Sequence, residues 1–475
     1  MQPNEARLIR ALAREGLGVS HAGDTYTVRL LASPEAPEAR VLLPPSLPIE
    51  SKGLHQIANL AATTHPYGGS VTRAVATPDF HPGDGIAIGS VMEMKDMLIP
   101  AGVGGDINCG MRLHVMDLPL DTFMAGKNRL VELLKGDYFL GTRDIPMTPG
   151  AMWALFEYGV PYWLQALKDE GTHGHMTLAD LGQLKQELGR VFHEGSFWGD
   201  PHWAPQSLTR DGDLIRDGGL ATIGGGNHFV EIQEVMEVLD RSWAHAWGVR
   251  EGQMAFMIHS GSRIVGKNIG TSWKDIARNA WPKGTPYPES GIFPVVMTPE
   301  RDYIGDYLRA EGAAVNYGFV NRLLLAEIMR WRLREVFGPL VAPLVYDIPH
   351  NITLSEGGKW VTRKGSCPAH AGQPVIIPGS MGTASYLMVG LGNDTWISSA
   401  SHGAGRAHSR FQMGRRGSKV EHGLEGVDCI TLREERKIEE APSAYKPIQP
   451  VVDVQVKAGT VSPVARLRPV LTFKA

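Results

Sequence analysis

The sequence predicts a mixed fold, α+β or α/β, in which a β-sheet core is surrounded by peripheral helices. Short β-prone runs broken by glycine and proline turns fill residues 64–89 and return from Val341 to the end of the chain. Apolar side chains at helical spacing fill two other segments, 149–195 and 300–337. Polar motifs are scattered from residue 79 to residue 474, so tertiary folding must gather them.

On size alone, 475 residues could form roughly two to four units. The scattered motifs instead favour a single catalytic domain over residues 1–475, with a helical insertion at about 149–195. Hydrophobic residues make up 43% of the chain and charged residues 20%, which is typical of a folded protein. A net charge of −3 excludes a uniformly basic protein that coats nucleic acid, yet it leaves room for a local positive groove.

The three cysteines, at 109, 367 and 429, cannot form a disulfide framework and indicate a reducing compartment. The first ten residues lack the apolar segment of a signal peptide, and no apolar run is long enough to span a bilayer. We therefore expect a cytoplasmic protein with no membrane partner.

In chain order, residues 4–15 have apolar side chains on one helical face, behind a cap that Asn4 could provide. Residues 26–31 are predicted to form a strand and residues 53–63 a helix.

The aromatic residues of the insertion are predicted to lie mostly in the core; they are Trp153, Phe156, Tyr158, Tyr162 and Trp163. Residues 300–337 are predicted to form a long amphipathic helix with a structural role.

Residues 100–112, P-A-G-V-G-G-D-I-N-C-G-M-R, are the most informative stretch. Its four glycines free the backbone to turn and to approach a ligand closely, and they bracket Asp106 and Cys109. Two such side chains three residues apart on a loop can point at one centre. The alternative is that Cys109 is only a small buried hydrophobic residue beside a turn.

Three of the 17 histidines share a context, a position at the carboxyl end of an apolar β-like run; they are His228, His259 and His350. Each could instead be a core residue with a satisfied ring. Together with Asp106 and Cys109 they favour a metal centre, with one ion or with two that share the thiolate. Such mixed oxygen, nitrogen and sulfur ligands suit Mn, Fe, Co or Zn, and two ions would suit phosphoryl chemistry.

His402 lies in S-A-S-H-G-A-G-R-A-H-S-R, where Arg406 and Arg410 supply cations suited to phosphate. Its imidazole could be a nucleophile on phosphorus, or it could only bind phosphate or have a structural role. Residues 378–385, P-G-S-M-G-T-A-S, offer hydroxyl and backbone N–H groups of the kind that cradle phosphate.

Two further motifs leave two interpretations open. Asp79 and His81 could orient the site or form a structural turn. Lys474 could be solvated at the chain end, or the apolar residues before it could dock its amine into a site.

These motifs together resemble the RtcB family of GTP-dependent RNA ligases. The resemblance covers about residue 50 to the end and rests on motifs in the family's order: D-I-N-C-G-M-R, G-G-G-N-H-F-V-E, H-S-G-S-R, the H-N of 347–351, R-K-G at 363–365, P-G-S-M-G-T-A-S, S-H-G-A-G-R and A-Y-K at 444–446. It implies an RtcB-like fold with a metal cleft at the centre of the β-sheet core.

The resemblance also implies a role for each matching residue. Cys109 would bridge two Mn²⁺ ions, one also held by Asp106 and His228 and the other by His259 and His350. His402 would take GMP from GTP. The residues that would hold the guanylate are Asn227, Glu231, Ser380, Ser385, Gly405, Tyr445 and Lys474. The residues that would meet the substrate phosphate are Arg263, Arg406 and Arg410.

The implied activity joins an RNA 3′-phosphate or 2′,3′-cyclic phosphate end to a 5′-hydroxyl end, in tRNA splicing or RNA repair. The implied partners are that RNA, GTP and an activating protein similar to archease. The chain departs from many members at Asp84, Gly105, Ile264 and Val265, which concerns the substrate more than the chemistry. The alternatives are a dinuclear metal phosphoesterase, an enzyme that caps 3′-phosphate ends of RNA or DNA, and a non-catalytic protein that binds RNA ends.

Overall fold

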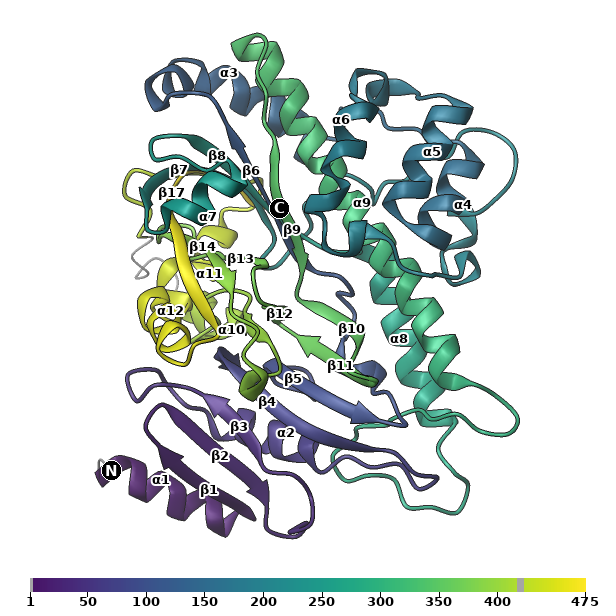
Figure 1. Cartoon of the computed structure of the whole chain (residues 1–475), viewed down its shortest axis with the longest axis vertical. Helices are drawn as coiled ribbons and strands as arrows, with labels where there is room; N and C mark the ends of the chain where they lie inside the picture. Colours follow the sequence, from purple (N-terminus) through teal and green to yellow (C-terminus); the bar gives the residue numbers. More distant parts are fainter. Residues whose placement is uncertain (1–2, 417–422) are drawn as a thin grey trace.

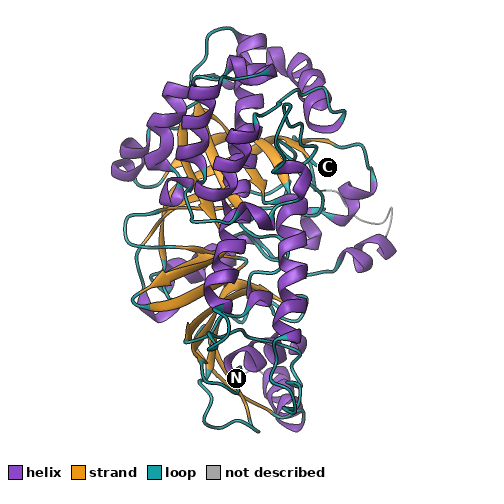
Figure 2. Ribbon diagram, turned by 90° about the vertical axis from the view of Figure 1, so that its right-hand side faces the viewer, coloured by secondary structure: helices purple, strands orange, loops and turns teal. Residues whose placement is uncertain are grey.

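The computed structural model describes residues 3–416 and 423–475 of the chain. Two large β-sheets and a two-stranded sheet form the centre of the molecule, with helices packed around them (Figures 1 and 2). The predicted fold class is confirmed. Nearly all neighbouring strands are antiparallel, so of the two forms considered the α+β form applies.

The first sheet contains the N-terminal strands and one later hairpin. Its strands, in spatial order, are β1 (Leu17–Ala22), β2 (Thr25–Leu30), β3 (Ala39–Leu42), β4 (Ser70–His81), β5 (Ile88–Lys95), β11 (Lys359–Lys364) and β10 (Asn351–Glu356). Only the β3–β4 pair is parallel. Helix α1 (Pro3–Arg14) packs on β1, and α2 (Ser51–Ala61) packs on β4.

The second sheet carries most of the candidate site. Its strands, in spatial order, are β13 (Pro374–Ile377), β14 (Ser385–Gly390), β17 (Val461–Phe473), β7 (Phe229–Val238), β8 (Met254–Ser260), β6 (Gly110–Met116) and β9 (Leu344–Pro349). β16 (Asp428–Ile430) pairs with β17 in parallel, and β12 (Ser366–Pro368) pairs with β15 (Ser399–Ser401) as a separate ribbon.

The register of this sheet brings distant motifs together at one end of its strands. Gly110 of β6 lies opposite both Ser260 of β8 and Pro349 of β9, and Phe229 of β7 lies opposite His259. Because neighbouring strands run in opposite directions, the start of one strand lies beside the end of the next. Residues just outside these strand ends therefore converge.

The helices surround the sheets. The remaining α-helices are α3 (Leu120–Phe139), α4 (Pro149–Tyr158), α5 (Val160–Glu170), α6 (Leu181–Gln186), α7 (Arg241–Trp247), α8 (Arg263–Asn279), α9 (Tyr303–Phe337), α10 (Arg410–Arg416), α11 (Glu435–Glu439) and α12 (Ile448–Lys457). Short 3₁₀ turns are η1 (Pro100–Gly102), η2 (Gly174–Leu178), η3 (Glu187–Arg190), η4 (Phe192–Gly195), η5 (Pro201–Trp203), η6 (Gln206–Leu208), η7 (Asp394–Trp396) and η9 (Pro442–Ala444).

Most predicted elements are present, with differences that have physical reasons. The first helix begins at Pro3, so Asn4 lies inside it and the predicted cap is wrong. α9 was predicted to be amphipathic, yet every residue from Ala310 to Trp331 is buried. It packs against α3, α4, α8 and β8, so no side of this segment is left for solvent.

The helices expected within 149–195 are found as α4, α5 and α6 with short 3₁₀ turns. Their aromatic residues are not mostly core, because three of the five are exposed: Trp153, Tyr158 and Tyr162. The assignment of a single domain with an insertion stays a prediction. Within the described part of the chain, no helix combines the length and the apolar character needed to cross a membrane.

Candidate functional site

The five predicted metal ligands lie together where strands of the second sheet begin or end. The Sγ atom of Cys109 is 3.2 Å from Nε2 of His228 and 3.1 Å from Nε2 of His259. These three ligand atoms all lie within 4.8 Å of one another, and all three side chains are buried. Asp106 Oδ2 is 2.9 Å from Nε2 of His228, and the Nε2 atoms of His259 and His350 are 3.2 Å apart. The cluster is a candidate metal site with Cys109 at its centre.

His228 reaches this end of the sheet differently from the prediction. It precedes β7, which begins at Phe229, whereas His259 and His350 lie at the carboxyl ends of β8 and β9. Because β7 and β8 are antiparallel, a residue before one strand and a residue at the end of the other lie at the same end of the sheet. The predicted position at the end of an apolar run is thus wrong for His228, although the three histidines do meet.

The donor set fits a divalent metal ion. Nδ1 of His228 is 3.1 Å from the carbonyl oxygen of Ile223, and in the tautomer that donates this bond the lone pair of Nε2 is free. Burial lowers the pKa of His259 and of His350 well below the usual value, so both rings are neutral, the form that binds metals.

The acidic members of the cluster respond to burial in opposite ways. Burial favours the neutral carboxyl of Asp106, but its interactions with His228, Cys109 and Arg263 together outweigh burial and hold the pKa of Asp106 below its usual value. Burial and then Asp106 raise the pKa of Cys109 well above its usual value. A bound cation acts against this rise, because a metal ion favours the thiolate.

A hydrogen bond from α9 and close packing of Gly261 fix the loop that carries Asp106 and Cys109. Asn108 has a positive φ of 51°, and its carbonyl oxygen accepts a 2.6 Å hydrogen bond from Nη1 of the buried Arg322. Gly261 packs against this loop so closely that a Cβ atom there would lie 2.4 Å from Oδ1 of Asp106. Of the four glycines in 100–112, only Gly104 has a positive φ.

His402 follows β15, beside the metal cluster. Its ring centroid is 4.6 Å from that of His350 and 6.5 Å from that of His259. Nδ1 of His402 lies 2.5 Å from Oδ2 of Asp79, and the backbone N–H of His402 donates to the same oxygen at 3.2 Å. Asp79 is fully buried near the end of β4 and accepts a third hydrogen bond, from Thr77. Asp79 therefore orients the ring, one of the two roles left open by its sequence.

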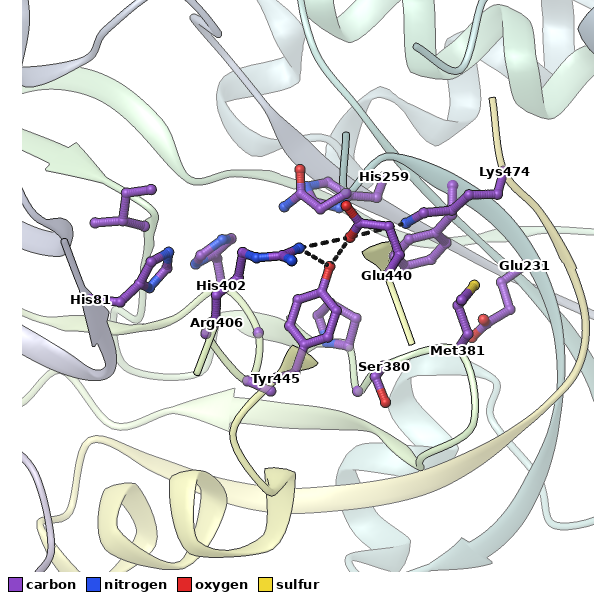
Figure 3. Close-up of a pocket in the computed structure, with 18 of the residues that line it drawn as sticks. His81, Glu231, His259, Ser380, Met381, His402, Arg406, Glu440, Tyr445 and Lys474 are labelled. Carbon is purple, nitrogen blue, oxygen red and sulfur yellow. Dashed lines mark hydrogen bonds and ion pairs between the residues drawn. The ribbon is translucent and has the colours of Figure 1, made fainter. Parts of the chain in front are cut away.

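Two cavities meet at His402. One, of about 210 Å³, contains most of the predicted nucleotide and phosphate residues in its wall (Figure 3). Those residues are Asn227, Glu231, Ser380, Gly405, Arg406, Arg410, Tyr445 and Lys474. The other cavity, of about 280 Å³, is lined by Asp106, Cys109 and His350 on the metal side. Because Asn227 and His402 line both, the imidazole lies between the cluster and the larger set of polar groups.

Lys474 and Glu231 show how strongly the first cavity is desolvated. Lys474 is 2% exposed despite its place next to the end of the chain, and burial lowers the pKa of its amine. Burial raises the pKa of Glu231 to about 7, although Thr472 and Gln233 both donate to its carboxylate. Of the two interpretations of Lys474, docking into the cavity is the one that the structure contains.

Two of the residues predicted to meet nucleotide or phosphate lie outside both cavity walls. Ser385 is buried behind the first cavity, where its hydroxyl accepts hydrogen bonds from the backbone of Gly379 and from the side chain of Gln233. Arg263 donates from Nε to Thr222 at 3.1 Å and packs directly on Gly224. Gly224 has a φ of +90°, and a Cβ atom there would overlap the guanidinium, so the triple-glycine turn makes room for Arg263.

Two of the four departures from the family pattern line the metal-side cavity, and the other two lie on α8. Asp84 lines the second cavity, where it forms a 3.0 Å ion pair with Lys274. Gly105 lines the same cavity, and a Cβ atom added there would lie 3.6 Å from Cα of Lys267, an ordinary contact distance. On α8, Ile264 is half exposed and Val265 is buried.

Three further charged residues at the site were not singled out from the sequence. Glu440 and Lys364 line the first and the second cavity. Lys446 donates to the carbonyl oxygens of Pro78 and Phe80, on either side of Asp79. Burial lowers the pKa of both lysines to about 8. Each lysine falls in a motif of the resemblance, R-K-G and A-Y-K, which was the available signal; Glu440 has no such signal.

Comparison with known proteins points to one family. The family model described as "tRNA-splicing ligase RtcB" matches residues 56–475. The chain is 32% identical to the tRNA-splicing ligase RtcB of Thermococcus kodakarensis, over 88% of this chain and 90% of the relative. It is 32% identical to the protein of that name from Archaeoglobus fulgidus, over 89% and 90%. It is 31% identical to the "RNA-splicing ligase RtcB homolog 2" of Entamoeba dispar, over 89% and 84%.

Proposed function

The chain belongs to the RtcB family of tRNA-splicing ligases, and on that premise we propose that it is a GTP- and Mn²⁺-dependent RNA ligase. It joins a 3′-phosphate or 2′,3′-cyclic phosphate end to a 5′-hydroxyl end, in tRNA splicing or RNA repair. The observation that carries this proposal is the place of His402. Its ring lies in the wall shared by the metal-side cavity and the cavity that contains the predicted nucleotide residues.

The contact with Asp79 supports a nucleophilic role for His402. With Nδ1 engaged by the buried carboxylate, Nε2 keeps its lone pair and is the nitrogen left to attack phosphorus. An ionised Asp79 also stabilises the positive charge that the ring gains as the bond forms. Burial favours the neutral acid, but the interactions of Asp79 with His402, Thr77 and His81 together outweigh it and hold the pKa of Asp79 below its usual value.

The proposed metal is Mn²⁺, with two ions. Asp106 and His228 would hold one and His259 and His350 the other, with Cys109 shared between them; the near-equal distances from Sγ of Cys109 to His228 and to His259 support this division. Bound there, the ions would offset negative charge on the phosphate oxygens that react beside His402.

The proposed nucleotide site is the cavity on the other side of His402. Glu231, Asn227 and Ser380 would bind the guanylate with Gly405, Tyr445 and Lys474, while Ser385 would act by holding Gly379 in place. Arg406 and Arg410 line the same cavity and would meet phosphate. Arg263 would act beside the metal cluster, where its charge also helps to keep Asp106 ionised.

The proposed reaction has three steps. Nε2 of His402 attacks the α-phosphorus of GTP and pyrophosphate leaves, which forms a histidine–GMP phosphoramidate. An oxygen of the RNA 3′-phosphate then attacks the same phosphorus and His402 leaves, after water has opened any cyclic phosphate. Finally the RNA 5′-hydroxyl attacks the activated 3′-phosphate, GMP leaves, and a phosphodiester is formed. Positioning supplies in-line geometry in each step.

The first test is formation of the histidine–GMP adduct. Incubation with α-labelled GTP and Mn²⁺ is expected to label the wild-type protein, and His402→Ala is expected to remove the label. His202→Ala is the matched control, because the side chain of His202 is 79% exposed and lies on η5. Failure of the wild type to form an adduct with any divalent metal would overturn the proposal, and phosphate release from RNA without an adduct would favour the phosphoesterase alternative.

A paired cysteine experiment tests the metal part of the proposal. Cys109→Ala is expected to abolish the adduct and to lower the metal content of the purified protein, measured by mass spectrometry. Cys367→Ala is the control, because Cys367 is also buried but its Sγ donates to the carbonyl oxygens of Ala400 and Ser401 instead of meeting the histidines of the cluster. Full labelling and full metal content in Cys109→Ala would remove this thiol from the metal site.

The remaining proposals concern the setting of the reaction. We place the enzyme in the cytoplasm, which the three free cysteines support. An activating protein similar to archease is part of the proposal. It predicts that archease raises multiple-turnover ligation of RNA ends while leaving a single round of adduct formation unchanged.

A further inference from the structure

Glu440 is a buried carboxylate in the nucleotide cavity to which neither the family resemblance nor the proposed reaction assigns a role. It follows α11 and lines the cavity next to Tyr445, Arg406 and Lys474 (Figure 3). Its side chain is 0% exposed. Burial of an ionised carboxylate is costly unless charged partners surround it, so the contacts of Glu440 indicate what it does.

Four side chains converge on this carboxylate. Nε of Arg410 donates to Oε1 at 2.7 Å, and Nη1 of Arg406 donates to Oε2 at 3.1 Å. The Tyr445 hydroxyl donates to Oε2, and Nζ of Lys474 lies 3.9 Å from the same oxygen. All four partners also line the cavity. Glu440 thus connects residues proposed for the guanylate with residues proposed for phosphate.

The charges explain why these contacts form. Arg406, Arg410 and Lys474 are three cations around one small cavity, where like charges disfavour one another unless an anion lies between them. Burial alone would raise the pKa of Glu440, but Lys474, Arg410 and Arg406 together hold it below its usual value. The carboxylate is therefore ionised, and its charge is shared among the three cations.

The hydrogen bonds also fix how the arginines face the cavity. Nη2 of Arg406 donates to the carbonyl oxygen of Glu439 at 2.8 Å, and Nε donates to that of His408 at 3.0 Å. With Nη1 on Glu440, all three nitrogens of this guanidinium are held and its plane is set. Arg410 uses Nε for Glu440, which leaves its two terminal nitrogens for a ligand, and its side chain is 43% exposed.

We propose that Glu440 is a positioning residue for phosphate recognition: its carboxylate holds the charge of Arg406 at the cavity wall and turns Arg410 so that the free terminal N–H groups of Arg410 receive the triphosphate of GTP. This inference rests on the proposed function, because it takes GTP as the ligand of the cavity. Planar guanidinium groups bind phosphate oxygens through directed hydrogen bonds, so their orientation decides how much of their charge is useful.

A positioning role and a purely electrostatic role of Glu440 predict opposite effects of its removal on triphosphate binding. If Glu440 only reduced the positive charge of the cavity, its removal would strengthen triphosphate binding. If it positions the arginines, its removal weakens binding, because the guanidinium groups are free to turn away. The direction of the change in the KM for GTP separates these roles.

The test compares Glu440→Gln with wild type in adduct formation from GTP and Mn²⁺. Gln keeps the shape, but it removes the charge and presents an N–H donor to the arginines. We expect the KM for GTP to rise by at least about tenfold, the equivalent of one lost charge-assisted hydrogen bond, with a smaller fall in kcat. Glu440→Asp keeps the charge and is expected to restore part of the loss. An unchanged or lower KM in Glu440→Gln overturns the proposal.

The neighbouring Glu439→Gln is the matched control, because the Glu439 side chain pairs with Arg436 and only its backbone contacts Arg406. It is expected to keep the wild-type KM. If Glu440→Gln does not fold, Glu440→Asp carries the test, and a wild-type KM in that variant overturns the proposal.

A second measurement separates this inference from the proposed function. Binding of inorganic tripolyphosphate in the presence of Mn²⁺, followed by titration calorimetry, requires no adduct. If the wild type forms no adduct, the ligase proposal fails. Weaker tripolyphosphate binding by Glu440→Gln than by wild type still supports the positioning role, and equal binding overturns it.

Discussion

At the scale of single residues, the site is built from buried pairs in which one member sets the state of the other. Asp79 and His402 are the clearest case. Oδ2 of Asp79 accepts from the ring and from the backbone of His402, and Oδ1 accepts from Thr77, so the carboxylate cannot turn without losing three hydrogen bonds. Thr77 in turn contacts the hydroxyl of Ser366 at 2.9 Å, which ties β4 to β12 behind the histidine.

This pair leads to a prediction for Asp79→Asn. The amide would keep the size of the side chain but donate a hydrogen bond to Nδ1, which places the ring proton on Nε2 and removes the lone pair that attacks GTP. The single-turnover rate of adduct formation is expected to fall by roughly 100-fold or more, with metal content unchanged.

Asp275→Asn, an exposed position on α8, is the control for that experiment. A wild-type rate of adduct formation in Asp79→Asn would show that the tautomer of His402 is set by another group.

At the scale of elements, the metal loop depends on α9, whose buried residues anchor it. Nη1 of Arg322 donates to the carbonyl oxygens of Asn108 and Ser260, at 2.6 and 3.0 Å. Its Nε donates to Asp347 at 2.9 Å, and Asp347 also receives Arg112 from β6. One helix therefore connects the loop of Cys109 with β8 and β9, which carry His259 and His350.

The prediction at this scale concerns Arg322→Leu. Arg322 is fully buried, and its loss would leave Asp347 with one partner and two carbonyl oxygens without their donor. Loss of one partner of a buried ion pair costs about 3–5 kcal/mol, so the thermal midpoint is expected to fall clearly.

Arg129→Leu provides the comparison, since Arg129 is 66% exposed and its 3.4 Å pair with Glu335 lies on the surface. Removal of that pair is expected to cost less than about 1 kcal/mol. Equal thermal midpoints for the two variants would contradict the anchoring role of α9.

At the scale of the whole molecule, sequence patterns indicated many residues of the site, but they did not show which strand pairings bring these residues together. His259 and His350 could be recognised because a polar residue at the end of an apolar run is visible locally, and Cys109 because it shares a glycine-rich loop with Asp106. The convergence of His228 with them depends on antiparallel pairing between β7 and β8, which no local pattern specifies. Glu440 was missed because its role depends on contacts with Arg406, Arg410 and Lys474, which are far from it in the sequence.

The same limit applies to burial. Periodicity predicted a helix at 300–337 correctly, but it cannot show how many neighbours surround that helix, so the burial of α9 on all sides was not predicted. For the aromatic residues of 149–195 the error has the opposite direction. Tyr158 and Tyr162 pack against each other at the surface, with ring centroids 4.8 Å apart and ring planes tilted by 38°, instead of entering the core.

The burial of α9 gives a prediction for the stability of the whole molecule. Glu311 is fully buried there and accepts from the backbone of Thr353 at 2.6 Å, and burial raises its pKa to about 7 from 4.5. Between those two values the folded protein binds the proton and the unfolded chain does not. The stabilisation of the folded protein by this proton is therefore complete below about pH 4.5 and is lost as pH rises through 7. The loss lowers the free energy of unfolding by about 3 kcal/mol.

Buried histidines with lowered pKa values oppose this trend at acidic pH, so the comparison must be made against Glu311→Gln. That variant resembles the protonated side chain and has no proton to lose. The thermal midpoint of wild type minus that of Glu311→Gln is expected to become more negative by a few degrees between pH 5 and pH 8. If this difference stays constant over the range, Glu311 is ionised in the folded protein throughout, as it is in the unfolded chain, and the proposed shift of its pKa is contradicted.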